Sequence, residues 1–125
     1  MNGKVEWDNQ QYLNIETFRK TGVGVKTPVW FVRNGDKLFV RTIADSGKVK
    51  RIRNNSNVNI AACKSDGGLL SDWIPAEARI VSDSEVHQHV DRLLDKKYGL
   101  MKKMFALASA VQGRKYTVLE INIKE

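Results

Sequence analysis

The residues best suited to chemistry are a hydroxyl, a glycine and two cations at the expected start of a short helix. Ser46, Gly47 and Lys48 are consecutive, and Arg51 follows about one helical turn after Lys48. A helix start presents unpaired N–H groups and the positive end of the helix dipole, and glycine lets an anion approach the backbone. The two cations can converge on the same oxygens, and each charge-assisted hydrogen bond contributes on the order of 1.5–3 kcal/mol. This pattern is typical of a phosphate-binding site.

The same basic residues are also typical of a solvated helix face. Lys48, Lys50, Arg51 and Arg53 form the most informative positive cluster in a chain of net charge +7. Such a charge favours anionic partners, but it does not choose among nucleic acid, lipid and a phosphorylated cofactor. The segment Val25–Phe31 adds a proline-interrupted strand and flat side chains that suit a planar heterocycle, although barrel core has the same composition.

The other reactive residue types do not form a site. His87 and His89 stand two positions apart on a predicted helix, so they point to different faces and cannot bind one metal together. We expect both to be surface residues. Cys63 lies beside two alanines in a predicted strand and is more typical of a small buried side chain than of a nucleophile. We therefore predict no catalytic side chain and no metal site.

Alternating apolar and polar residues between turn signals predict six strands. They span Tyr12–Phe18, Val25–Val32, Leu38–Ile43, Val58–Cys63, Asp72–Val81 and Tyr116–Ile123. Three helices are expected: Lys48–Arg53 capped by Asp45 or Ser46, one from a Ser82–Glu85 capping box to Gly99, and Leu100–Gln112. The pattern indicates a mainly β (α+β) fold, a mostly antiparallel barrel with peripheral helices.

The two strands of the predicted hairpin, Val25–Val32 and Leu38–Ile43, have no fully polar face. A sheet with apolar residues on both faces needs cover on both sides, from the barrel interior and from outside. A partner subunit is one such cover. Pro28 lacks a backbone donor, so we expect it at a sheet edge or a bulge.

Composition is that of an ordinary globular protein. With 125 residues, 42% of them hydrophobic and 28% charged, we expect residues 1–125 to form a single domain. The single cysteine excludes an internal disulfide and fits a reducing compartment, and no apolar run reaches the length of a membrane helix. We expect a cytoplasmic protein without a membrane partner.

Three blocks of sequence, in this order, resemble one protein family. They are Thr17–Lys20, Lys26–Phe31 and Asp45–Asn54, and Trp73–Arg79 and Lys96–Leu100 extend the similarity over nearly the whole chain from Tyr12 onward. The family is the pyridoxamine-5′-phosphate-oxidase-like (PPOX class) flavin and deazaflavin oxidoreductases, which have an FMN-binding split barrel. Together the blocks are a strong signal, whereas any one of them alone is weak.

The resemblance implies a six-stranded antiparallel split β-barrel that forms a homodimer with two cofactor sites at the interface. The implied cofactor is flavin mononucleotide (FMN) or coenzyme F420, and some members of the family bind haem. By position, Lys48 holds the cofactor phosphate with Ser46 and Arg51, and Thr42 approaches the ribityl-type chain. The residues that line the ring are Thr27, Pro28, Val29 and Trp30, with Trp73 a candidate contact from the partner chain.

The sequence lacks the long C-terminal substrate-binding segment of true pyridoxamine-phosphate oxidases, so vitamin B6 oxidation is not expected. The leading interpretation is an oxidoreductase in which the flavin or deazaflavin transfers hydride to a small organic substrate. The alternative is a carrier or sensor of flavin, deazaflavin or haem without enzymatic activity. Nucleic-acid binding is the third and weakest interpretation, because no aromatic residues are interleaved with the basic cluster.

Overall fold

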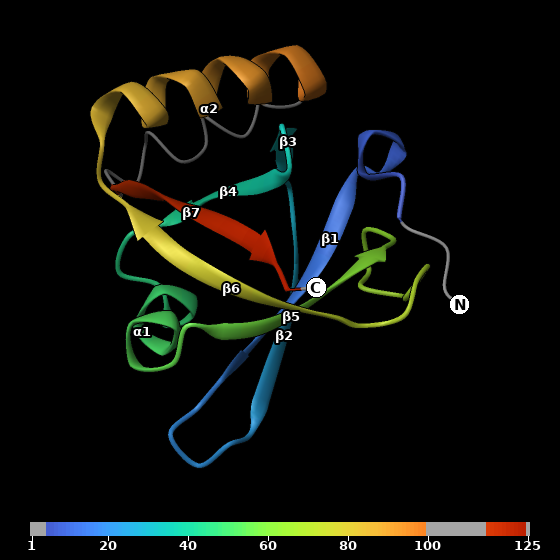
Figure 1. Ribbon diagram of the computed structural model, residues 1–125, viewed down its shortest axis with the longest axis vertical. Coiled ribbons are helices and arrows are strands. Elements are labelled where there is room, and N and C mark those ends of the chain that lie inside the picture. The colour runs from blue at the N-terminus through green and yellow to red at the C-terminus, as the bar shows by residue number, and fades with distance from the viewer. Residues whose placement is uncertain (1–4, 100–114, 125) are drawn as a thin grey trace.

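The computed structural model describes residues 5–99 and 115–124, and the strands among them form one antiparallel sheet. The strands are β1 (Tyr12–Phe18), β2 (Gly24–Val29), β3 (Val32–Asn34), β4 (Lys37–Ile43), β5 (Asn57–Cys63), β6 (Ile74–Val81) and β7 (Tyr116–Ile123). Their order across the sheet is β2-β1-β5-β6-β7-β4-β3. A 3-10 turn, η1 (Trp7–Asn9), and two helices, α1 (Gly47–Asn54) and α2 (Ser84–Tyr98), are the other described elements (Figure 1).

The sheet curls into a half-barrel. β2 and β3 lie at opposite ends of the strand order, yet only Trp30 and Phe31 separate them in the chain. The curl therefore brings the two ends of the sheet toward each other (Figure 1). Pro28 lies on β2, an edge strand of the described sheet, as its missing backbone donor predicts.

The described sheet has seven strands rather than six because the predicted strand Val25–Val32 is divided in two. Phe31, at the break, gives its backbone N–H to the hydroxyl of Tyr98 at 3.0 Å, and its carbonyl lies 2.9 Å from the same hydroxyl. Tyr98 belongs to α2, so a side chain takes the place that a neighbouring strand holds in a ladder. The predicted strand is therefore divided by a tertiary contact, which cannot be predicted from the strand propensity of its residues.

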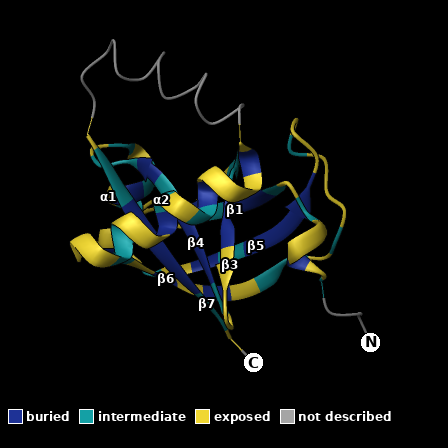
Figure 2. Ribbon diagram, turned by 90° about the horizontal axis from the view of Figure 1, so that it is seen from above, coloured by how far each residue is buried: buried dark blue, intermediate teal, exposed yellow. Residues whose placement is uncertain are grey.

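The concave face of the sheet holds the main core. Leu13 and Ile15 of β1, Ile60 of β5 and Leu119 of β7 are fully buried there. Helix α1 closes this core through Val49 and Ile52, which are also buried (Figure 2). The i, i+3 spacing of these two residues places them on one side of the helix, as the sequence predicts.

Helix α2 covers the other face of β4 and β7. Its buried residues Val90, Leu94 and Tyr98 pack against Phe39 of β4 and Val118 of β7. This contact supplies, within one chain, part of the outside cover that a partner subunit was expected to provide. The helix begins one residue later than the predicted capping box, because Asp83 rather than Ser82 is the N-cap.

The ends of the helices follow ordinary capping chemistry. Asp83 Oδ1 accepts hydrogen bonds from the N–H groups of Glu85 (2.8 Å) and Val86 (3.4 Å). Gly99 ends α2 with a φ of 55°, a conformation that favours glycine. The predicted helix Leu100–Gln112 lies outside the described residues. Neither described helix has the length and apolar composition of a membrane span.

Candidate phosphate-binding site

The start of α1 is built as an N-terminal cap with a free hydroxyl proton. Ser46 has an extended backbone, and its Oγ accepts a hydrogen bond from the Val49 N–H at 3.4 Å. Of the two caps that the sequence allowed, Ser46 is therefore the one used. Because the cap uses Oγ as an acceptor, the hydroxyl proton remains available to an anion in front of the helix.

Arg51 folds back over the first turn of the same helix. Its Nε donates to Thr17 Oγ1 on β1 at 2.6 Å, and a Cβ added to Gly47 would lie 2.7 Å from its Nη1. Any larger residue at position 47 therefore displaces the guanidinium. Thr17 is fully buried, so it is a fixed anchor for Arg51. The sequence predicts that Gly47 lets an anion approach the backbone. The structure shows that Gly47 also leaves room for the Arg51 guanidinium.

Lys48 is half-buried beside this guanidinium. Burial lowers the pKa of Lys48, and the positive charge of Arg51 lowers it further. In the described part of the chain no carboxylate or carbonyl accepts a hydrogen bond from the Lys48 ammonium. Two neighbouring cations that lack an acidic partner gain most from an anion that contacts both.

The predicted ring-lining residues occupy β2 and the residue after it. Thr27 and Val29 pair with Ile15 and Leu13 of β1, whereas Pro28 pairs with Asn14. Successive strand residues point to opposite faces, so Thr27 and Val29 share a face that the Pro28 side chain does not. A ring on one face of β2 therefore contacts only part of the predicted set through side chains.

The phosphate residues and β2 are linked through β1. Thr17, which anchors Arg51, pairs directly with Val25, two residues before Thr27. Strand geometry puts Trp30 about 16 Å beyond Val25, so only an elongated ligand can extend from α1 along β2. One face of the Trp30 ring is already covered by Tyr98, with the two rings parallel within 8° and their centroids 4.3 Å apart.

Thr42 lies on the other side of the approach to α1. It is buried on β4, where it pairs with Thr117 of β7. The chain then turns, and the Ser46 N–H donates to the Ile43 carbonyl at 3.1 Å. Thr42 is therefore close in the chain to the phosphate residues, but no described hydrogen bond joins it to them. Trp73 is half-buried, with the Lys26 ammonium 5.5 Å from its ring centroid.

The basic cluster does not form one exposed surface. Lys50 and Arg53 are exposed, whereas Lys48 and Arg51 are half-buried. The helix thus divides the cluster into a solvated pair and a pair at the site. This division supports the phosphate interpretation over a nucleic-acid surface, which uses cations that can reach a long backbone.

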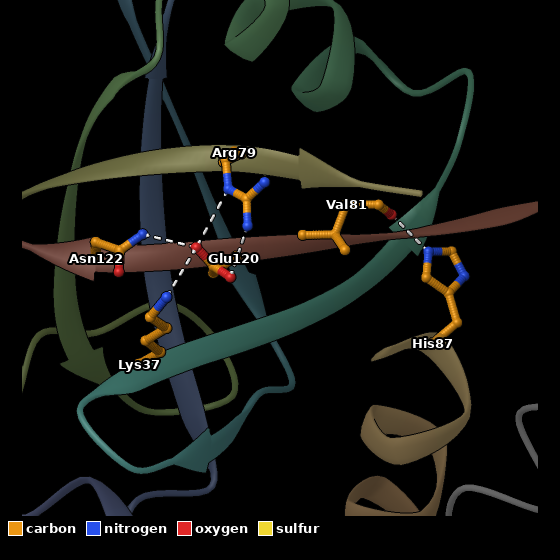
Figure 3. Close-up of polar contacts among 6 residues, drawn as sticks. All are labelled: Lys37, Arg79, Val81, His87, Glu120 and Asn122. Carbon is orange, nitrogen blue, oxygen red and sulfur yellow. Dashed lines mark hydrogen bonds and ion pairs between the residues drawn. The ribbon is translucent and has the colours of Figure 1, made fainter. Parts of the chain in front are cut away.

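Several charged or polar groups elsewhere have structural roles. Glu120 is a buried carboxylate between Arg79 (3.1 Å), Lys37 (3.4 Å) and the Asn122 amide (3.0 Å) (Figure 3). Burial raises the pKa of Glu120, but its hydrogen bonds from Arg79 and Asn122 and the nearby positive charges outweigh this effect and lower it overall. This carboxylate is satisfied by the protein itself.

The histidines and the cysteine also lack a catalytic arrangement. His89 is exposed as predicted, but His87 is half-buried and its Nε2 lies 2.6 Å from the Val81 carbonyl (Figure 3). A carbonyl only accepts, so this nitrogen carries the proton. Burial raises the pKa of the buried Cys63 thiol, which disfavours the reactive thiolate.

The comparisons with known proteins concern the fold. No protein-family model matches the sequence, and no curated protein matches it. A solved structure from Listeria innocua, provisionally named a pyridoxamine 5′-phosphate oxidase, is 14% identical over 94% of this chain and 87% of its own, with a TM-score of 0.68. The haem storage protein HutZ of Vibrio cholerae is 16% identical over 94% and 84%, with a TM-score of 0.71.

A third solved structure, an F420 reductase, is 14% identical over 94% of this chain and 90% of its own, with a TM-score of 0.61. Identities this low show a shared fold and not a shared activity. The curled antiparallel sheet is consistent with the fold that these structures share. The chain has the split-barrel fold of the pyridoxamine-5′-phosphate-oxidase-like proteins.

Proposed function

We propose that this protein binds a phosphorylated flavin-type coenzyme, FMN or coenzyme F420, with its phosphate at the start of α1. The observation that carries the proposal is the pair of half-buried cations, Lys48 and Arg51, at a helix start where none of the described residues is their acidic partner. The residues fit the group: the Ser46 hydroxyl can donate to a phosphoryl oxygen, and both cations can contact the others.

In this proposal the ring lies toward β2. The free edge of β2 offers backbone donors and acceptors, whereas the side chains of Thr27 and Val29 lie on the same face as the core residues Ile15 and Leu13. Thr42 contacts the chain between ring and phosphate, and a second copy of the protein completes each site in a homodimer. The single-domain, cytoplasmic protein then acts on a small organic molecule.

The bound coenzyme supplies hydride chemistry, so the protein needs only to bind, orient and shield it. Arg51 is oriented by Thr17, and Ser46 by its place as N-cap. Lys48, partly withdrawn from water, interacts more strongly with a phosphate than an exposed lysine does. No protein acid or base is assigned to the reaction.

The test is a titration of the purified protein with FMN and with coenzyme F420, followed by absorption and fluorescence. Lys48→Ala should weaken binding by about ten-fold or more, the loss of at least one charge-assisted hydrogen bond. Lys50→Ala is the matched control, because Lys50 is an exposed cation on the same helix. Equal binding by the wild type and Lys48→Ala contradicts the proposed phosphate site.

A carrier of flavin, deazaflavin or haem is the second candidate. HutZ, a haem storage protein, matches this fold with a TM-score of 0.71, against 0.61 for the F420 reductase. Turnover separates the two functions. If the reduced, bound coenzyme is oxidised by none of a panel of enones, quinones and nitro compounds, the carrier is favoured; haem binding is followed by its Soret band.

A further inference from the structure

A cationic pocket, apart from the proposed phosphate site, lies between η1, β3 and the last turns of α2. It has a volume of about 210 Å³. Its lining residues are Asp8, Val32, Arg33, Leu93, Lys96 and Lys97. None of these residues belongs to the proposed coenzyme site, so a ligand in this pocket does not depend on the coenzyme.

The arginine and the aspartate in this pocket satisfy each other. Arg33 donates to both carboxylate oxygens of Asp8, at 2.9 and 2.7 Å, and its Nη1 donates to the Gly35 carbonyl at 2.7 Å. The pair is therefore neutral as a unit, with the guanidinium fixed in place. The charge left over in the pocket is positive, from Lys96 and Lys97.

Lys97 is held by Phe31, the residue at which the predicted strand is divided. Its ammonium donates to the Phe31 carbonyl at 3.0 Å and lies 3.5 Å from the centroid of the Phe31 ring. An ammonium has three N–H donors, and within residues 5–99 and 115–124 this is its one hydrogen bond. Two donors therefore remain for a ligand, on a cation that is already oriented.

The surroundings of Lys97 make an anionic ligand favourable. Burial lowers the pKa of Lys97 to about 8, and the charge of Asp8 only partly opposes this effect. An anion against the ammonium restores the interactions that burial removes. Val32 and Leu93, on the walls of the same pocket, offer an apolar surface beside the cations.

We propose that this pocket binds a small organic anion, with its carboxylate or phosphate group on Lys97 and Lys96 and its apolar part on Val32 and Leu93. The ionisable groups that face the pocket are Asp8 from η1, Arg33 from β3 and the two lysines from α2. The Tyr98 hydroxyl lies behind Lys97 on the same Phe31 carbonyl, and Glu6 acts on Arg33 by its charge.

The test uses benzoate and phenyl phosphate as the two kinds of organic anion, benzamide as a neutral analogue and inorganic phosphate as an anion without an apolar part. At millimolar concentrations, benzoate or phenyl phosphate should shift the NMR signals of the Val32 and Leu93 methyl groups and of Lys97 Cε. Whichever binds more tightly identifies the head group. Absence of any shift with both, or equal affinity for benzamide or inorganic phosphate, overturns the proposal.

Lys97→Met should weaken binding of the organic anion by about ten-fold or more, and Lys64→Met, at an exposed position, should not. Wild-type affinity should fall as the pH rises above about 8, because Lys97 then loses its proton. If Lys97→Met fails to fold, Lys96→Met provides the second variant, with a smaller loss expected. Unchanged affinity in whichever variant folds overturns the proposal.

Discussion

The two described helices carry opposite charges at their starts. Helix α2 has the carboxylates of Asp83 and Glu85 at its start and Lys96 and Lys97 in its last turn, which is the arrangement that stabilises a helix dipole. Helix α1 has no acidic residue in its first turn and carries Lys48 there. The rule that favours stability is thus followed at the start of α2 and broken at the start of α1, although α1 also carries cations, Arg51 and Arg53, in its last turn.

Two lysines whose pKa is lowered by burial show what the difference means. Lys97 has partners in the protein, namely the Phe31 carbonyl, the Phe31 ring and the charge of Asp8, and two of its N–H donors remain for a ligand. Lys48 has Arg51 beside it, and both burial and that charge lower its pKa. A residue that breaks a local rule is typical of a functional site, which agrees with the proposed phosphate site at Lys48.

The largest expected effect is on the α2 side, where the structure depends on one hydroxyl. Tyr98→Phe leaves the buried Phe31 N–H without this acceptor and removes the single hydroxyl proton that the Phe31 and Gln11 carbonyls share. We expect the free energy of unfolding to fall by about 1–3 kcal/mol in urea denaturation. Tyr116→Phe, at a half-buried tyrosine of β7, is the control; equal losses in both variants contradict the special role of Tyr98.

On the α1 side we expect the main effect on ligand affinity instead. Thr17→Val keeps the shape of the buried side chain but removes the acceptor that orients Arg51. The affinity for the bound coenzyme should fall about 2- to 10-fold, the equivalent of one ordinary hydrogen bond. Thr17→Ser retains the hydroxyl and should bind nearly as the wild type does. Matched affinities of the valine and serine variants would show that Thr17 has no positioning role.

Removal of the Lys48 charge should have a smaller effect on the free energy of unfolding, and of opposite sign. Without coenzyme, Lys48→Ala should raise the free energy of unfolding by about 0.3–1 kcal/mol, because it removes a cation from the positive end of α1. Lys97→Ala should not raise it, since its cation lies at the favourable end of α2. Thermal denaturation of the two variants side by side measures the difference. Destabilisation by Lys48→Ala removes the basis for contrasting the helices.

Much of the sheet follows from local sequence pattern. The strands Tyr12–Phe18 and Tyr116–Ile123 have the predicted bounds, because unbroken segments of strand-forming residues end at clear turns. The strand Val25–Val32 does not, since the group that takes the Phe31 backbone lies 67 residues away in sequence. Alternation within a segment carries no information about such a distant partner.

The residues of the candidate site also separate into those set by local interactions and those set by distant ones. Ser46, Gly47, Lys48 and Arg51 could be found from capping rules and charge, which act within one turn of a helix. The role of Thr17 could not, because it lies 34 residues from the arginine that it orients. Its presence in the block Thr17–Lys20 of the family resemblance is the one signal that pointed to it.

The smallest expected effect is the pH dependence of stability, which tests the lowered pKa of Lys97 directly. Its pKa is about 8 in the folded protein and has the ordinary value of 10.5 when the chain is unfolded, so between these values the unfolded chain binds more protons. The free energy of unfolding contributed by this group is therefore lowest below pH 8 and rises as the pH increases toward 10.5. Solvent around the side chain keeps the slope of stability against pH small.

Urea denaturation from pH 7 to pH 10 should show the wild type gaining stability relative to Lys97→Met. Lys48 adds a residual slope of the same sign to both proteins. Parallel curves over this range mean that Lys97 is solvated like any surface lysine, and the contrast between helices α1 and α2 then rests on Lys48 alone.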